Sequence, residues 1–151
     1  MTVTFCGHGA FRGTEEYEKR ILTILEETVG DEYADMYLGG YGGFDDFAYE
    51  CCRKYKASHP NISLIFVSPY LTEEYQKNHL SHQRTMYDFI IYPEIEDKPK
   101  RYAIAYRNRY MVEKADLVVA YITHDWGGAY NTYRYAKRRK KPIFNISGKE
   151  F

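Results

Sequence analysis

The fold is decided by a strand, turn and helix near the C-terminus: Leu117-Val118-Val119-Ala120-Tyr121-Ile122, then Thr123-His124-Asp125-Trp126-Gly127-Gly128, then a predicted helix over 129–140. The first six residues are a continuous apolar run, as expected of a parallel strand that is covered on both faces. A glycine turn that joins such a strand to a helix is typical of α/β proteins.

The same alternation continues outward along the chain. Strands are predicted over 2–6, 33–38, 62–67 and 142–146, and helices over 17–28, 44–55 and 101–114. Between residues 70 and 99 the pattern weakens, and we expect a long loop there with a short strand at Phe89-Ile90-Ile91. With right-handed crossovers, this order predicts a Rossmann-like, three-layer α/β/α fold with a mainly parallel sheet.

Composition limits the classes of protein. The 151 residues fit a single domain. Lys+Arg and Asp+Glu each number 21, so the net charge is zero and no global field favours nucleic acid or an anionic membrane. The chain has no secretory leader, no apolar run near about 20 residues and only three cysteines, which predicts no membrane partner and a reducing cytoplasm. Whether it forms a homo-oligomer stays open.

Several predicted turns bring small or polar residues to one edge of the sheet. In such sheets ligands bind at the carboxyl ends of the strands, near the point where strand order reverses. Glycine lets the backbone approach a ligand, and free N–H groups at helix starts attract phosphate. We therefore expect a nucleotide or related phosphorylated molecule to be bound by Gly7, His8, Gly39, Gly40, Tyr41, Gly42, Gly43, Asp45, Ser68, Arg107, Thr123, His124, Trp126, Gly127, Gly128 and Thr132.

Phosphate is assigned to the helix after Gly127-Gly128, because Asp45 at the other glycine turn would repel it. Asp45 could instead accept a hydrogen bond from a ribose hydroxyl, or simply cap its helix. Thr132 could add a donor or bond to its own helix, and Arg107 could clamp a phosphate.

The aromatic residues of the predicted site have several interpretations each. Trp126 could stack on a base, close over the ligand or pack in the core. His8 and His124 could meet across the pocket as donors or as a proton-transfer group, or could only satisfy loop backbone. His79 and His82 are three residues apart but lack ligand partners at suitable spacing, so no metal and no cofactor is predicted.

Four motifs resemble the SLOG superfamily, and more narrowly its small stand-alone members from bacteria and phages: Phe5-Cys6-Gly7-His8, Leu38-Gly39-Gly40-Tyr41-Gly42-Gly43-Phe44-Asp45, Ala115-Asp116-Leu117-Val118-Val119-Ala120-Tyr121 and Thr123-His124-Asp125-Trp126-Gly127-Gly128-Ala129. The resemblance implies a Rossmann-type nucleotide-binding fold, and its relatives include DNA-processing protein A and the Lonely Guy phosphoribohydrolases.

The chain departs from that pattern at two places. Many relatives carry Arg directly after Gly-His, whereas Gly9 stands here and the next arginine is Arg12. Lonely Guy enzymes follow their glycine turn with a glutamate, whereas here Gly128 leads to Thr132-Tyr133-Arg134-Tyr135. The resemblance therefore does not carry the hydrolase activity over.

Three functions remain after these observations. The favoured one is binding or sensing of a nucleotide without turnover, with no catalytic residue assigned. The first alternative is an N-glycosidic hydrolase or transferase that uses Asp45, Asp46 or Asp125. The second alternative is single-stranded nucleic-acid binding through the basic run 137–141 and exposed tyrosines, which the zero net charge makes unlikely.

Overall fold

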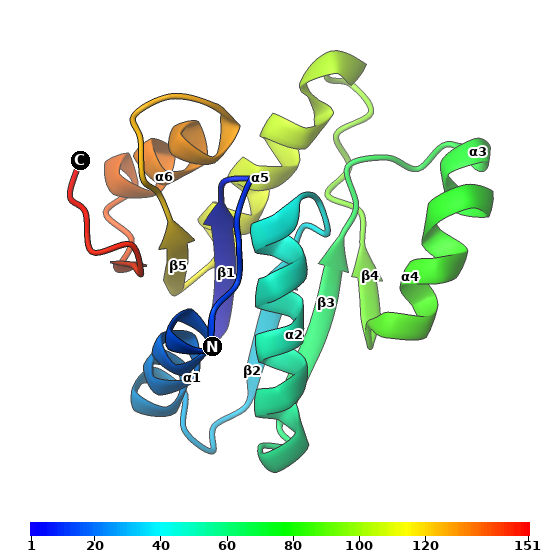
Figure 1. Ribbon diagram of the computed structural model, residues 1–151. Helices are drawn as coiled ribbons and strands as arrows, with labels where there is room; N and C mark the ends of the chain where they lie inside the picture. Colours follow the sequence, from blue (N-terminus) through cyan, green and yellow to red (C-terminus); the bar gives the residue numbers. More distant parts are fainter.

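The computed structural model describes residues 1–151 and contains one six-stranded sheet. Its strands are β1 (Thr2–Gly7), β2 (Ala34–Leu38), β3 (Ile62–Val67), β4 (Phe89–Ile91), β5 (Leu117–Tyr121) and β6 (Ile143–Asn145), in the order β4-β3-β2-β1-β5-β6. Every neighbouring pair is parallel. The predicted Rossmann-like fold is confirmed, with a sheet that is wholly parallel (Figure 1).

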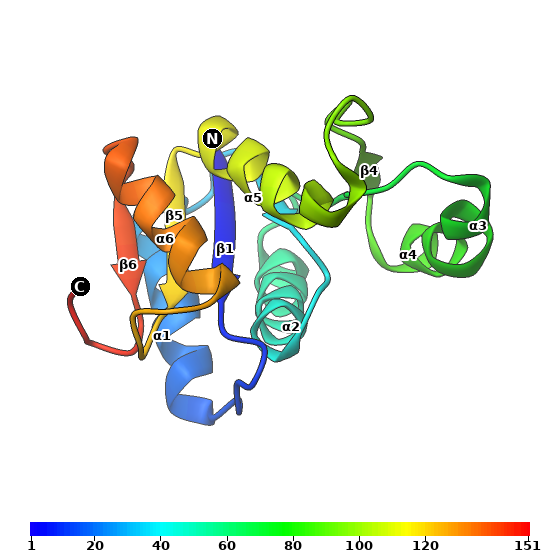
Figure 2. The ribbon, with the colours of Figure 1, turned by 90° about the horizontal axis from the view of Figure 1, so that it is seen from above.

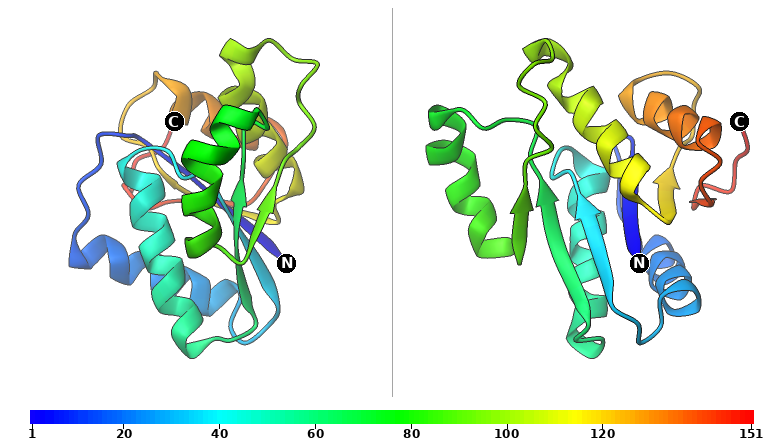
Figure 3. Two further views of the ribbon diagram at one scale, coloured as in Figure 1. Left: turned by 90° about the vertical axis from the view of Figure 1, so that its right-hand side faces the viewer. Right: turned by 180° about the vertical axis from the view of Figure 1, so that it is seen from behind.

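Four long helices cover the two faces of the sheet. One face carries α1 (Glu15–Thr28) and α2 (Gly43–Ser58), and the other carries α5 (Ala103–Lys114) and α6 (Gly128–Arg138). Figure 2 shows the two helical layers on opposite sides of the strands, and the right-hand view of Figure 3 shows α5 beside α6. A short 3-10 turn, η2 (Lys100–Tyr102), leads into α5.

Alternate strand residues fill two cores, which explains why the central strands are apolar without interruption. Val3 and Phe5 of β1 pack toward α1 and α2, whereas Cys6 packs toward α6. The larger core, on the α1 and α2 face, includes Ile21, Leu25, Met36, Leu38, Phe44, Ala48 and Phe66. The smaller core includes Val112, Val118, Ile122, Tyr133 and Ala136.

The prediction of a long loop over residues 70–99 is wrong for its first half. A helical run extends through α3 (Glu73–Tyr75), a π-helical turn η1 (Gln76–Leu80) and α4 (Ser81–Met86), and lies beyond the β4 edge of the sheet (Figures 1 and 2). Leu80 is the one fully buried residue of this run, so the apolar stripe that identifies a helix is nearly absent. The start signal was present, since Thr72 accepts a hydrogen bond from the Tyr75 N–H and two glutamates follow it.

Two further features bear on the composition argument. The cysteines Cys6, Cys51 and Cys52 are all buried and unpaired. No helix is both long enough and apolar enough to cross a membrane.

Candidate functional site

A cavity of about 360 Å³ lies at the carboxyl edge of the sheet, where the strand order reverses between β1 and β5. We call it the switch-point cavity. Its wall is built from the ends of those strands, the α5 helix and the start of α6, which is the position where α/β sheets bind ligands. Ten of the predicted site residues line it: Gly7, His8, Tyr41, Asp45, Arg107, His124, Trp126, Gly127, Gly128 and Thr132.

The start of α6 is open toward this cavity. Gly127 precedes the helix with φ 95°, and no side chain caps the first turn. A Cβ atom at Gly127 or Gly128 would meet nothing within 4 Å, so the approach to the backbone is unobstructed. Because the first N–H groups of a helix have no intrahelical acceptor, they are free to donate to an anion.

Arg107 reaches the cavity from α5 although its side chain is only 1% exposed. Its Nη1 donates to the Gly39 carbonyl at 2.9 Å and to the Val67 carbonyl at 2.8 Å, and its Nε donates to Asn108 Oδ1 at 2.9 Å. No protein atom accepts from Nη2. The carbonyls at the ends of β2 and β3 therefore fix the guanidinium group, and its Nη2 remains without an acceptor in the protein.

Asp45, at the start of α2, is the one carboxylate in the cavity wall. Its Oδ2 accepts a hydrogen bond from the Tyr41 N–H at 3.0 Å, so the residue fixes the preceding glycine turn. Desolvation in this recessed position raises the pKa of Asp45 to about 6, although the Tyr41 N–H and the Arg107 charge both lower it. Asp45 thus carries a negative charge at neutral pH in the same cavity wall as the uncapped start of α6.

Three aromatic rings form a continuous stack along the wall. The rings of His8 and His124 lie 3.7 Å apart with planes 10° from parallel, and the His124 and Trp126 rings lie 4.0 Å apart at 32°. Trp126, at the outer end, is 67% exposed. The stack presents a planar face of the kind that base rings pack against.

His8 is held by the backbone rather than poised as a base. Its Nε2 accepts a hydrogen bond from the Thr123 N–H at 3.1 Å, which requires the remaining ring proton to be on Nδ1. Burial, and to a smaller extent the neighbouring His124, lowers the pKa of His8. His8 therefore orients the turn after β5 and is neutral at pH 7.

The first glycine turn faces the protein itself instead of the cavity. A Cβ at Gly43 would lie 2.7 Å from the Gly9 carbonyl oxygen, to which the Gly43 N–H already donates at 2.9 Å. A Cβ at Gly42 would lie 3.0 Å from Gly9 Cα, and one at Gly40 would lie 2.7 Å from the Phe66 ring. These three glycines allow close packing of the turn, so of the two Gly-Gly turns only the one at Gly127 and Gly128 has open backbone.

The other predicted residues make internal contacts. Ser68 is fully buried, and its hydroxyl bonds to the backbone of Tyr70. Thr132 lines the cavity, but its hydroxyl donates to the Gly128 carbonyl of its own helix at 3.1 Å. Neither Gly39, Ser68 nor Thr123 belongs to the cavity wall.

Eight residues of the wall were not predicted from the sequence. Three of them lie near Arg107 on α5: Ile104, Asn108 and Met111. Because residues three or four apart share one face of a helix, Ile104 and Met111 could have been predicted from Arg107. The others have no such signal: Phe5, Cys6, Gly9, Ala10 and Ala129. Burial raises the pKa of the Cys6 thiol to about 12, so Cys6 is not a nucleophile here.

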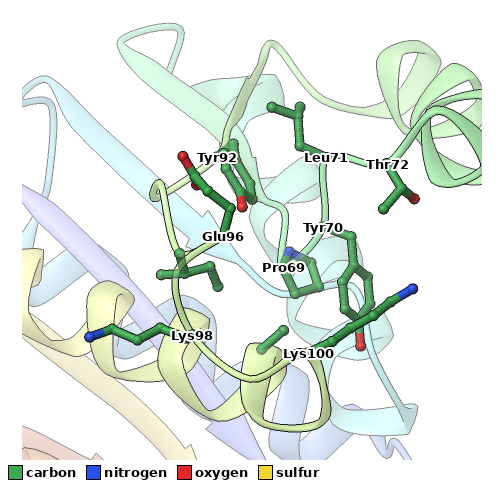
Figure 4. A pocket seen from close by; sticks show the side chains of 10 residues that line it. Pro69, Tyr70, Leu71, Thr72, Tyr92, Glu96, Lys98 and Lys100 are labelled. Atoms are coloured by element: carbon green, nitrogen blue, oxygen red, sulfur yellow. The ribbon is translucent and has the colours of Figure 1, made fainter.

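A second cavity, of about 420 Å³, lies at the ends of β3 and β4, between the loop at 69–72 and the segment before α5. Figure 4 shows Lys98 directed away from Tyr70, and Lys100 extended along that ring. Lys98 pairs with Asp97 at 3.8 Å, and Lys100 lies 5.9 Å from the centre of the Tyr70 ring. Glu96 shares this wall with the two lysines and no glycine turn lines it, so the cavity at the switch point is the better candidate site.

Fold and cavity together define a Rossmann-type α/β protein with a cavity at the switch point of its sheet. No family model matches the chain. It is 27% identical over 151 residues to the prophage-derived protein YoqJ of Bacillus subtilis, covering 84% of this chain and 88% of YoqJ. It is 26% identical over 132 residues to the UPF0398 protein BH1768 of Halalkalibacterium halodurans, covering 83% of this chain and 67% of that protein.

Solved structures with the same fold include two forms of DNA processing protein A. The one from Helicobacter pylori, described by its single-stranded DNA binding, has a TM-score of 0.64 with 21% identity over 96% of this chain and 64% of its own. The one from Streptococcus pneumoniae has a TM-score of 0.65 with 15% identity over 95% and 49%. This chain thus spans 64% of the first protein and about half of the second.

The structure of TM1055 is also similar, with a TM-score of 0.54 and 14% identity over 94% of this chain and 71% of that one. These likenesses confirm the Rossmann-type fold that the resemblance to the SLOG superfamily implies.

Proposed function

We propose that this chain binds a nucleotide or a closely related phosphorylated small molecule in the switch-point cavity. One juxtaposition carries the proposal: the uncapped start of α6 lines the same cavity as Arg107, whose Nη2 has no acceptor in the protein. A helix start contributes about 0.3–1 kcal/mol toward an anion. A charged hydrogen bond adds about 1.5–3 kcal/mol. Both terms favour a phosphate group, whereas the Asp45 carboxylate in the same wall opposes one, so the phosphate is assigned to the α6 end of the cavity.

The remaining parts of a nucleotide also find complementary groups. The stack of His8, His124 and Trp126 offers a face for the base. Asp45 uses Oδ2 for the Tyr41 N–H, so its Oδ1 is available to a ribose hydroxyl. A cavity of about 360 Å³ is within the range of small-ligand sites, although at its lower end.

Substitution of Gly128 tests the phosphate assignment. Gly128→Asp should fold, because a Cβ there meets nothing within 4 Å and an acidic residue suits a helix start. Its carboxylate would repel a phosphate by about 4 kcal/mol at a separation near 4 Å and an effective dielectric constant of about 20. We expect binding of AMP, measured by calorimetry and thermal shift, to weaken by roughly 100-fold or more.

Gly128→Ala is the matched control, since it adds the same Cβ without the charge. It should keep the affinity for AMP within about threefold, a difference below 1 kcal/mol. Equal affinity in the wild type, Gly128→Ala and Gly128→Asp proteins would contradict the assignment. No thermal shift with any member of a nucleotide panel would contradict the proposed function.

The same incubations test for an enzyme. Asp45 is the one carboxylate that could stabilise a sugar cation or activate water in this cavity, whereas Asp46 and Asp125 lie outside its wall. Release of free base by the wild type that is lost in Asp45→Asn would establish an N-glycosidic hydrolase. Binding without base release is the outcome that our proposal expects.

Single-stranded DNA binding is the second candidate function, and the fold favours it, because DNA processing protein A of Helicobacter pylori binds single-stranded DNA. The zero net charge does not count against it, since the charges are unevenly placed: α6 carries Arg134, Lys137 and Arg138 and no acidic residue. Steeply salt-dependent binding of a thymidine oligonucleotide would support this function.

A further inference from the structure

A groove of about 310 Å³ runs between α5 and α6 on the rear face of the sheet, where the two helices lie side by side (Figure 3). Arg109 enters its wall from α5, and Arg134 and Arg138 enter it from α6, one helical turn apart. The wall contains no acidic residue. Three arginine residues therefore line one groove whose wall contains no carboxylate.

These arginines have aromatic neighbours but no acidic partners. Arg109 lies 5.6 Å from the Tyr106 ring centre and 5.4 Å from that of Tyr135, and Arg138 lies 5.7 Å from Tyr135. None of the three is among the ion pairs of the protein. The acidic residue that the two helices do contain, Glu113, accepts a hydrogen bond from the Tyr135 hydroxyl. A bound anion would relieve the mutual repulsion of the three guanidinium groups.

The groove continues directly from the switch-point cavity. Asn108, Gly128 and Thr132 belong to the walls of both. A ligand group bound in the groove would thus be adjacent to a phosphate bound at the start of α6. Arg109 and Arg138 both lie near the Tyr135 ring. A planar guanidinium group can donate to phosphate oxygens through its N–H edge.

We infer that the ligand carries a second phosphate group, which binds to Arg109, Arg134 and Arg138 in this groove. The inference rests on the proposed function, because it assumes a first phosphate at Gly128. A longer phosphate chain on one nucleotide and the next nucleotide of a strand both provide such a group. The shared chemistry is a second phosphate in covalent continuity with the first.

The experiment compares three probes at one salt concentration: AMP, ATP and a 5′-phosphorylated thymidine decamer. Each is titrated calorimetrically against the wild type, Arg134→Gln/Arg138→Gln, and Arg109→Gln. Arg53→Gln/Lys54→Gln is the control, since it removes two charges of the same sign from exposed side chains of α2 on the opposite face. Gly128→Asp is included to report on the first phosphate.

We expect Arg134→Gln/Arg138→Gln to weaken ATP or the decamer by about tenfold or more, the loss of one charged hydrogen bond, and AMP by less than twofold. Arg109→Gln should act in the same direction from the other helix. A loss for ATP identifies a polyphosphate chain, and a loss for the decamer alone identifies a strand. Both outcomes support a second phosphate.

Two outcomes would overturn the inference. If AMP binds and is lost in Gly128→Asp, but neither ATP nor the decamer depends on the arginines, the second phosphate site is wrong and the proposed function stands. If no probe binds to the wild type, the proposed function fails and the inference fails with it.

Discussion

Gly39 illustrates how one residue positions the charges of the site without touching a ligand. A Cβ at this position would lie 3.1 Å from Asp45 Oδ2 and 3.2 Å from Arg107 Cζ. The missing side chain leaves the space in which both charged groups sit, and the Gly39 carbonyl holds the Arg107 guanidinium. Gly39 therefore leaves room for two buried side chains, whereas Gly127 and Gly128 leave their backbone open to the cavity.

The raised pKa of Asp45 predicts a specific pH dependence of stability. Its folded pKa is about 6 against an ordinary value of 3.8, so the folded state binds more protons between these two pH values. This contribution to stability is fully present below the ordinary value and is lost as pH rises toward about 6. Asp45→Asn keeps an acceptor for the Tyr41 N–H but does not titrate.

Urea unfolding of the wild type and Asp45→Asn across this pH range checks the prediction. The stability of Asp45→Asn relative to the wild type should increase as pH rises from about 4 to about 7. A difference that is constant with pH would show that Asp45 is not desolvated in the folded protein.

Alanine substitutions at Gly7 and Gly9 distinguish a packing role of glycine from a general effect on the flexibility of the loop. A Cβ at Gly7 would lie 2.3 Å from Phe44 Cγ at the start of α2, whereas one at Gly9 meets nothing within 4 Å. Gly7→Ala should destabilise the protein by about 1–3 kcal/mol in urea unfolding, because the end of β1 must move away from Phe44. Gly9→Ala should stay within about 0.5 kcal/mol. Equal effects would disprove this packing role.

At the scale of elements, the helical run from 73 to 86 differs from the helices that cover the sheet. It buries only Leu80 fully, and β4 beside it is an edge strand whose Phe89 is exposed. Segments with few buried apolar contacts open at lower free energy than the core. This part of the protein should therefore open without global unfolding.

Native-state hydrogen exchange measures that difference. Amides of residues 73–91 should exchange at least about tenfold faster than those of β1, β2 and β5, which are paired on both sides. Protection equal to that of the central strands would mean that the run belongs to the same cooperative unit.

In the whole molecule the net charge is zero, but the charges are distributed differently over the two helical faces. On α1 and α2 cations are paired with acids, as in Arg20 with Glu16, Arg53 with Glu50 and Lys54 with Glu18. The basic residues of α6 have no acidic residue on their own helix. Since exposed charges act over roughly 8–10 Å in physiological salt, an anion near α6 responds to the local surface and not to the sum.

Retention on phosphocellulose tests this asymmetry. Arg134→Gln/Arg138→Gln should elute at lower salt than the wild type. Arg53→Gln/Lys54→Gln, with the same net charge, should elute with the wild type because the changed residues lie on the other face. Identical shifts for both variants would show that net charge alone governs retention.

The parallel fold and the edge that carries the site were predictable from the sequence because both follow from local patterns. Continuous apolar runs such as Leu117 to Ile122 and Ile62 to Val67 indicate strands buried on both faces, and the intervening helices impose parallel pairing. The segment from 73 to 86 was missed for the opposite reason: a helix that packs weakly leaves little periodicity.

Chain order and right-handed crossovers place the carboxyl ends of parallel strands together, so local patterns suffice to predict that glycines, histidines and Trp126 gather there. Local patterns do not indicate which glycines face open space and which face Phe44, Phe66 or Gly9, nor that Arg107 is held by the carbonyls of Gly39 and Val67. The physical reason is that a residue's free volume and spare hydrogen bonds depend on neighbours far away in the chain, which no local pattern records.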